Sequence, residues 1–223
     1  MAKHPELLAK YPNVEVLPSN GQVRCLFASI RNSETSRRKF VFDSDRLITM
    51  LVEAALAKLP YKERTVKTPM GLEYVGAEFC SKLVGVPIVR AGESMEKALS
   101  NIIQEVRIGK ILIQRDEETA LPVLIYEKMP RDIANRHVLL LDPMLATGGS
   151  AMAAVKVLLD HGVKEDHIIF VNLISCPEGI DAFCGAFPQI RVVTGEIDDC
   201  LDERKYICPG IGDFGDRYFG TDI

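Results

Sequence analysis

The central part of the chain alternates between short apolar runs and helical segments, and this alternation restricts the possible fold more than any other feature. The apolar runs are residues 86–90 (VPIVR), 110–114 (KILIQ), 138–142 (VLLLD), 167–175 (HIIFVNLIS) and 190–196 (IRVVTGE). Helical segments are expected near residues 94–107, 150–161 and 178–187. Such alternation predicts an α/β fold, a mainly parallel twisted sheet with helices on both faces.

Weaker patterns surround this core, which is expected to span residues 40–196. Apolar residues at helical spacing predict a long helix from Phe40 to Leu59, and Pro60 follows as a stop. Residues 64–79 are typical of a hairpin. Residues 1–39 are expected to form an N-terminal arm, in which 23–30 (VRCLFASI) is a candidate strand.

Two further segments are expected to leave the regular pattern. Residues 121–129 (LPVLIYEKM) are predicted to extend from the sheet as part of a β-arm near residues 115–130. From residue 197 to 223 the chain is rich in Gly, Pro and Asp, which predicts irregular structure packed on the core as a C-terminal hood.

Composition limits the partners that we expect. The chain has 223 residues and a net charge of −4, which argues against the broad basic surface that a nucleic-acid polymer requires. It shows no signal-peptide pattern and no apolar run long enough to span a membrane, so we expect a cytoplasmic protein without a membrane partner. The six cysteines lack zinc-like spacing, and no protein metal site is expected.

The segment GIGDFG, residues 210–215, matches the dinucleotide fingerprint G-x-G-x-x-G. That fingerprint works only between a strand and a helix inside a strand-helix-strand unit. Because only eight residues follow Gly215, the helix, the second strand and the acidic residue cannot be supplied. These glycines therefore need another explanation.

The segment 138–150 (VLLLDPMLATGGS) carries the clearest chemical signal. A strand ends in Asp142, a loop of small residues turns, and a helix is expected to start at Ser150. Backbone N–H groups from Ala146 to Gly149 can bind a phosphate at that helix start, with hydroxyl groups from Thr147 and Ser150. Many such turns hold no ligand, but Asp142 at the strand end favours a ligand with a ribose diol. A Walker loop is excluded because no Lys follows the glycines.

Charged residues also follow two other predicted strands. Arg90 ends one of them and Arg115 follows another. Ligands of open parallel sheets bind at the carboxyl ends of the strands, so both side chains are candidates for contact with an anionic ligand.

The segment DPMLATGGS resembles the phosphoribosyl-diphosphate binding loop of type I phosphoribosyltransferases, and in particular that of uracil phosphoribosyltransferases. The resemblance continues through VPIVRAGESM, GKILIQRDEET, CPEGI and YICPGIGDFGDRYFGTD, from about residue 40 to the end. It implies transfer of a phosphoribosyl group from phosphoribosyl diphosphate (PRPP) to uracil, which yields UMP and diphosphate in pyrimidine salvage. Two other functions stay open: a non-catalytic nucleotide-sensing regulator, and a transferase for another nucleobase.

The resemblance also implies site residues. PRPP would contact Arg90, Arg115, Asp142, Pro143, Met144, Leu145, Ala146, Thr147, Gly148, Gly149, Ser150 and Asp213. Uracil would contact Ala146, Tyr206, Ile207, Gly212, Asp213 and Phe214. The catalytic candidates are Asp142, Arg115 and Asp213. Two alternatives remain: Phe214 is a core aromatic, and Asp213 serves only to satisfy N–H groups of its turn.

Further implications concern cofactors and assembly. Magnesium would bind together with the diphosphate of the donor. Some eukaryotic-type members of the family respond to GTP, and a basic patch that includes Arg37 and Arg46 is a candidate for its phosphates, although such charge runs are usually solvated faces. Family members are homodimers or homotetramers, so we expect a homo-oligomer.

Overall fold

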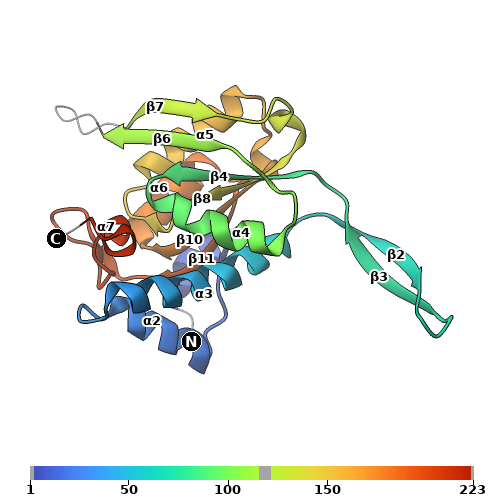
Figure 1. Cartoon of the computed structure of the whole chain (residues 1–223). Coiled ribbons are helices and arrows are strands. Elements are labelled where there is room, and N and C mark those ends of the chain that lie inside the picture. The colour runs from blue at the N-terminus through green and yellow to red at the C-terminus, as the bar shows by residue number, and fades with distance from the viewer. Residues whose placement is uncertain (1–2, 116–121, 222–223) are drawn as a thin grey trace.

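A mainly parallel sheet forms the centre of the protein. The computed structural model describes residues 3–115 and 122–221, and its sheet has the strand order β1-β11-β10-β8-β4-β6-β7 (Figure 1). These strands are β1 (Val14–Val16), β11 (Arg191–Ile197), β10 (Ile168–Ser175), β8 (His137–Leu141), β4 (Leu83–Val89), β6 (Lys110–Arg115) and β7 (Pro122–Lys128). Every pair along this order is parallel except β6 with β7. The predicted α/β architecture is confirmed.

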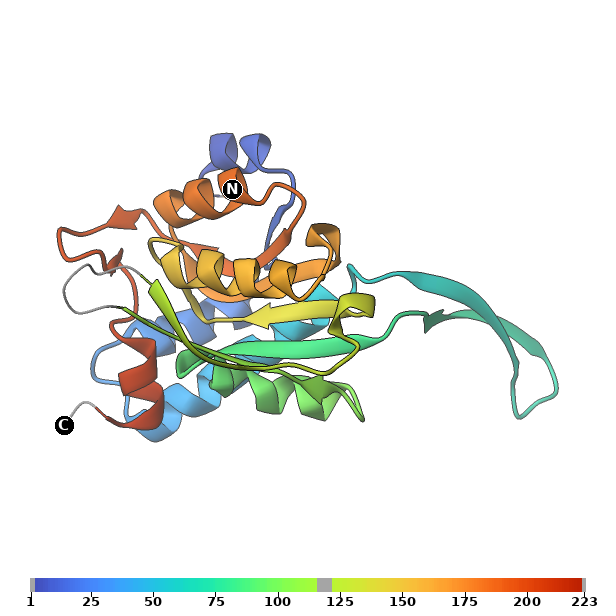
Figure 2. The ribbon, with the colours of Figure 1, turned by 90° about the horizontal axis from the view of Figure 1, so that it is seen from above.

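Helices cover both faces of the sheet (Figure 2). One layer consists of α2 (Gly21–Arg31), α3 (Arg37–Leu56) and α4 (Glu96–Ile102), and the other of α5 (Gly149–Asp160) and α6 (Pro177–Ala186). Alternate residues of β8 enter the two cores: Leu139 and Leu141 pack in one cluster, Val138 and Leu140 in the other. This alternation explains why the strands appear as continuous apolar runs.

The prediction of an N-terminal arm with a strand at residues 23–30 is wrong. Residues 21–31 form α2, whose start is capped by the Asn20 side chain accepting a hydrogen bond from the Val23 N–H at 2.9 Å. The buried residues of α2 are Val23, Leu26, Phe27 and Ile30. Their spacing of three and four places them on one face of a helix. Ahead of α2, α1 (Pro5–Lys10) leads into β1, which pairs with β11, so the N-terminal segment belongs to the core.

The projecting arm is not the one predicted. Residues 122–128 form β7, which pairs antiparallel with β6 at the sheet edge, and residues 116–121 of the expected arm lie outside the described residues. The hairpin predicted at residues 64–79 is confirmed as β2 (Tyr61–Lys67) and β3 (Glu73–Phe79). Figures 1 and 2 show that this hairpin extends away from the body of the molecule.

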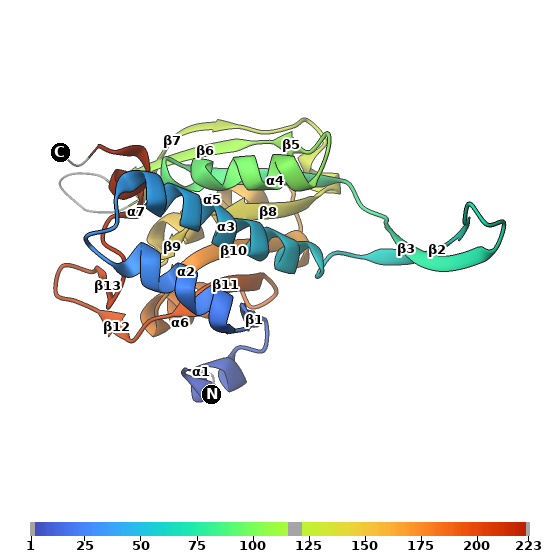
Figure 3. The ribbon, with the colours of Figure 1, turned by 60° about the horizontal axis from the view of Figure 1, so that its bottom comes forward.

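The C-terminal segment packs beside the carboxyl ends of the strands (Figure 3). It contains β12 (Cys200–Leu201), β13 (Ile207–Cys208) and the short helix α7 (Phe214–Phe219). Arg31 of α2 anchors its glycine turn by donating to the Gly210 carbonyl at 2.9 Å and to both carboxylate oxygens of Asp198 at 2.9 and 2.6 Å. The Gly210 N–H in turn donates to Asp198 at 2.8 Å.

None of the helices in residues 3–115 and 122–221 combines the length and the apolar run that a membrane crossing needs.

Candidate functional site

The loop from Asp142 to Gly148 is held against β10. The N–H groups of Leu173 and Ile174 both donate to the Pro143 carbonyl at 3.0 Å. Immediately afterwards, Met144 and Leu145 form β9, which pairs in parallel with Ile174 and Ser175. Because the strand continues to be paired along the loop, the residues after it emerge in a fixed position at the sheet edge.

Helix α5 begins directly after this loop, within one residue of the predicted start. Its N-cap is Gly148, whose φ of 79° lies in the left-handed region that favours glycine. Since glycine has no side chain to cap the helix, the N–H groups of the first turn stay available to a ligand. The hydroxyl groups of Thr147 and Ser150 flank them in sequence. The arrangement suits an anion such as a phosphate.

Helix α6 supports the loop from behind. The Cys176 Sγ donates to the Ala146 carbonyl at 3.2 Å. A Cβ atom placed on Gly179 would lie 2.4 Å from the Ala146 oxygen and 2.6 Å from the Leu145 oxygen. The backbone of α6 and that of the loop therefore approach each other closely, and only glycine at residue 179 permits this.

Asp142 lies where the sequence places it, directly after β8. Its Oδ1 accepts a hydrogen bond from the Met144 N–H at 3.3 Å, and its carbonyl accepts one from the Asn172 side chain at 3.4 Å. Burial raises the pKa of Asp142 to about 7, and the Met144 N–H offsets this only in part. Among the residues that the structure describes, Met144 supplies the one hydrogen bond to this carboxylate, which therefore has the capacity to accept more from a ligand such as a ribose diol.

Arg90 joins the strand ends to the C-terminal segment. It follows β4, and its Nη1 lies 2.9 Å from Oδ1 of Asp216, while its Nη2 lies 3.5 Å from Oδ1 of Asp213. The side chain is 44% exposed, so the guanidinium is accessible from solvent. The ion pairs bring residues 90 and 213–216 together although about 120 residues separate them in the sequence.

Arg115 is the last residue of β6, the strand beside β4. The backbone therefore places it at the same edge of the sheet as Arg90. Residues 116–121, which continue the predicted PRPP motif, lie outside the described residues.

The residues predicted to contact uracil have different surroundings. Phe214 is buried, with its ring 5.5 Å from that of Phe40 and 5.4 Å from that of Tyr218. This packing agrees with the core-aromatic alternative, and contact of Phe214 with uracil stays a prediction. Ile207 is buried and Tyr206 is half exposed. Gly212 adopts a φ of 76°, which only glycine takes without strain.

Asp213 caps helix α7 by accepting a hydrogen bond from the Asp216 N–H at 2.9 Å. This bond is the structural alternative considered for Asp213. Contact of Asp213 with PRPP or uracil stays a prediction. Asp216 and Arg217, which are neighbours in the sequence, have different hydrogen-bond partners. Asp216 bonds to Arg90, whereas Arg217 donates to the carbonyls of Ile211 at 2.7 Å and Asn32 at 2.9 Å.

The two basic residues considered for GTP lie on α3. Arg37 donates from Nε to the Tyr218 carbonyl at 3.0 Å, and the Arg46 guanidinium lies 6.0 Å from the Phe42 ring centre. Two hollows flank this helix surface; one is lined by Arg38, Lys39 and Phe42 among others, and the next by Arg46 and Lys97. Neither hollow has a residue of the loop at 142–150 in its lining.

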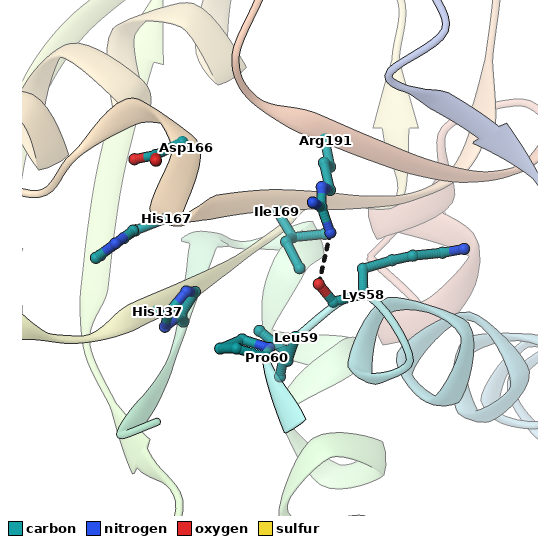
Figure 4. A pocket seen from close by; sticks show the side chains of 8 residues that line it. All are labelled: Lys58, Leu59, Pro60, His137, Asp166, His167, Ile169 and Arg191. Atoms are coloured by element: carbon teal, nitrogen blue, oxygen red, sulfur yellow. Dashed lines mark hydrogen bonds between the residues drawn. The ribbon is translucent and has the colours of Figure 1, made fainter. Parts of the chain in front are cut away.

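A cavity of about 550 Å³ lies at the other end of the sheet (Figure 4). Its lining includes His137, Ile169 and Arg191, which stand at the starts of β8, β10 and β11. Arg191 donates to the Lys58 carbonyl at 2.6 Å. This cavity is at the amino ends of the strands, whereas the loop, Arg90 and the C-terminal segment are at the carboxyl ends.

Sequence comparison decides the family. Residues 16–221 match the family model described as uracil phosphoribosyltransferase. The chain belongs to the uracil phosphoribosyltransferase family. It is 60% identical to a uracil phosphoribosyltransferase of Dictyostelium discoideum, over 95% of this chain and 99% of that protein. It is 54% identical to a uracil phosphoribosyltransferase of Saccharomyces cerevisiae, over 94% of this chain and 97% of the relative.

The fold of this chain is also similar to that of a solved structure. The AQ2163 protein of Aquifex aeolicus superposes with a TM-score of 0.82 at 29% identity, covering 94% of this chain and 99% of its own. The fold therefore agrees over nearly the whole chain.

Sequence reasoning missed several residues that shape this site. Gly179 lies against the loop at residues 142–150, and Arg31 bonds to the C-terminal segment. Within that segment, Asp198 accepts a bond from Gly210 and Thr221 accepts one from Arg90. The resemblance to uracil phosphoribosyltransferases covered CPEGI, which contains Gly179, but gave no role to this glycine. The resemblance likewise covered Thr221 without giving it a role. The contacts of Arg31 with residues 198 and 210 and that of Thr221 with Arg90 join distant parts of the chain, so no local pattern indicates them.

Proposed function

We propose that this protein is a uracil phosphoribosyltransferase that converts uracil and PRPP into UMP and diphosphate in pyrimidine salvage. The observation that carries the proposal is the ion-paired contact of Arg90 with Asp213 and Asp216. It brings the C-terminal segment, the proposed base site, to the sheet edge that carries the proposed phosphate loop. Family membership supports the same conclusion.

In this proposal the donor lies across the strand ends. Its 5′-phosphate would be bound by N–H groups at the start of α5 and its ribose hydroxyls by Asp142. Arg90 and Arg115 would bind the diphosphate, where negative charge increases as the bond to C1 of the sugar breaks. Holding N1 of uracil against C1 supplies orientation, so no nucleophilic side chain is needed.

We propose that Mg²⁺ enters the site with the donor. Within the described residues there is no group of three or more His, Cys, Asp or Glu side chains able to hold a metal ion. Mg²⁺ typically binds substrate phosphates and waters with one or two carboxylates, which fits a site of this kind. When bound, the ion would neutralise charge on the diphosphate.

The base would be recognised by the backbone around Gly212, because amide groups match the amide edges of uracil. Cytosine would present an exocyclic amine where uracil accepts a hydrogen bond, which leaves a donor unpaired. Asp213 is a candidate general base that would accept the N1 proton of uracil, in addition to capping α7.

The purified protein is expected to form UMP and diphosphate from PRPP, magnesium and uracil, but not to use cytosine, orotate, hypoxanthine or adenine at comparable rates. Product formation is measured by chromatography for each base. Donor binding without product would indicate a nucleotide-sensing regulator, and faster use of another base would indicate a different transferase. Either result would contradict the proposal.

We further propose that the protein is a homodimer or homotetramer and that GTP binds the α3 surface near Arg37 and Arg46. The hollows beside Phe42 and the positive charges nearby support a phosphate ligand there. GTP is expected to raise the rate or the oligomer size, and the Arg46→Ala variant to lose this response but keep its basal activity. Activity assays and light scattering with and without GTP test this; no response in the unmodified protein would refute it.

A further inference from the structure

One edge of the Arg90 guanidinium is fixed by the last helix and the residue after it. Nη1 of Arg90 donates to Oδ1 of Asp216 at 2.9 Å and to Oγ1 of Thr221 at 2.8 Å. The Thr221 hydroxyl donates to the same Asp216 oxygen at 2.6 Å. The three groups form a closed triangle of hydrogen bonds, in which each partner also orients the other two.

Gly215 lies directly against this guanidinium. A Cβ atom on Gly215 would lie 2.7 Å from Nη2 and 3.0 Å from both Cζ and Nε of Arg90. All three atoms are close to the same point, so a side chain at residue 215 would meet the side of the guanidinium that carries Nε and Nη2. This explains why the third position of GIGDFG is glycine without invoking dinucleotide binding, because a side chain at residue 215 would displace Arg90.

The opposite edge of Arg90 is left for a ligand. Within residues 3–115 and 122–221, Nε and Nη2 of Arg90 make no hydrogen bond, and the carboxylate oxygen of Asp213 is 3.5 Å from Nη2. Nε and Nη2 present two parallel N–H groups, the geometry with which arginine binds two oxygens of a phosphate group. The anchored Nη1 thus fixes the direction in which this pair points.

We propose that Asp216 and Thr221 are positioning residues for phosphoribosyl transfer, which hold Arg90 so that its Nε–Nη2 edge receives the diphosphate of PRPP. The proposal rests on the proposed function. An unrestrained arginine loses side-chain freedom when it binds a ligand, whereas a side chain that is already ordered loses less. The bonds from Thr221 and Arg90 lower the pKa of Asp216, so its carboxylate is ionised at neutral pH and keeps the triangle intact.

The variants Thr221→Val and Asp216→Asn test this inference. Each removes or weakens a bond to Nη1 with little change of shape, so the KM for PRPP is expected to rise about 10-fold, the effect of one charge-assisted hydrogen bond. The KM for uracil should change less than about 2-fold. Thr221→Ser retains the hydroxyl group, so its KM for PRPP is expected to equal that of the unmodified protein.

A matched control is Thr68→Val. The Thr68 hydroxyl donates to the Leu72 carbonyl in the turn between β2 and β3, far along the chain from Arg90, so its loss should leave both KM values unchanged. A second control combines Thr221→Val with Arg90→Ala. If Thr221 acts through Arg90, the double variant should have the KM for PRPP of Arg90→Ala alone.

The outcomes separate the inference from the proposed function. If the unmodified protein forms no UMP, the proposed function fails. If it forms UMP but Thr221→Val keeps the KM for PRPP, only the positioning role is refuted. Equal rises in both KM values together with a lower melting temperature would show a general structural role, and would also refute the inference. Three results together would support the inference. Thr221→Val raises the KM for PRPP but not that for uracil, Thr221→Ser keeps the KM of the unmodified protein, and Thr221→Val has no further effect on the KM when Arg90 is already alanine.

Discussion

Replacing Asp142 with asparagine is expected to lower kcat/KM for PRPP about 10- to 100-fold and, above pH 7, to make the folded protein more stable. The loss of activity follows from replacing an anionic acceptor by a neutral amide, since hydrogen bonds to charged groups contribute about 1.5–3 kcal/mol. The gain in stability follows from burial, which raises the pKa of Asp142 to about 7.

The pH dependence has a defined sign. In the unfolded chain an aspartate titrates near pH 4, so between about pH 4 and 7 the folded state binds more protons than the unfolded state. The contribution of Asp142 to stability is therefore fully present below about pH 4 and is lost as pH rises through about 7. Asparagine does not titrate, so the advantage of the variant should grow by roughly 2.6 kcal/mol between pH 5 and 8.

Urea unfolding of both proteins at pH 5 and pH 8 measures this difference in stability. In parallel, the ratio of kcat/KM between the unmodified protein and the variant should rise with pH through about 7, because the ionised carboxylate is a stronger acceptor for the ribose hydroxyls than the protonated carboxyl group. A constant difference in unfolding free energy, together with unchanged kinetics, would remove Asp142 from the site.

Replacing Gly179 with alanine is expected to lower kcat/KM for PRPP at least about 10-fold and the free energy of unfolding by about 1–3 kcal/mol. The added Cβ would lie 2.4 and 2.6 Å from the carbonyl oxygens of Ala146 and Leu145. Both contacts are with backbone, so the loop itself has to move, and the N–H groups at the start of α5 move with it.

The same helix offers a matched control. Gly185 also lies in α6, but a Cβ there would meet only the Tyr11 hydroxyl at 3.8 Å. Gly185→Ala should therefore keep full activity and raise the free energy of unfolding by about 0.5–1 kcal/mol, the difference in helix propensity. Steady-state kinetics and urea unfolding of both variants test this. Equal behaviour of the two alanines would show that α6 does not position the loop.

The core could be predicted from the sequence because each buried strand leaves a continuous apolar run and each helix a spacing of three and four. The loop at residues 142–150 was also predictable, since Asp142, Gly148 and Gly149 follow such a run directly. The error at residues 23–30 was avoidable. Asn20 is a capping residue, and Val23, Leu26, Phe27 and Ile30 follow at helical spacing.

Other features could not be predicted because they arise from distant contacts. The bond between Arg90 and Asp216 joins residues 126 positions apart. The pKa of Asp142 is raised by the packing that buries it. A side chain at residue 179 is excluded only because α6 lies against the loop at residues 142–150. The projecting arm was assigned to residues 121–129 rather than 61–79. Local sequence does not show that residues 122–128 pair with β6 at the sheet edge, whereas β2 and β3 pair with each other in a separate two-stranded sheet.

In the proposed function, the carboxyl ends of the strands bind a ribose phosphate beside the C-terminal segment. A crystal structure of the protein with UMP tests it most directly. We expect the 5′-phosphate within hydrogen-bond distance of the N–H groups at residues 147–149, and the base beside residues 207–212. A phosphate bound instead in the cavity near Arg191, with the loop at residues 142–150 empty, would contradict it.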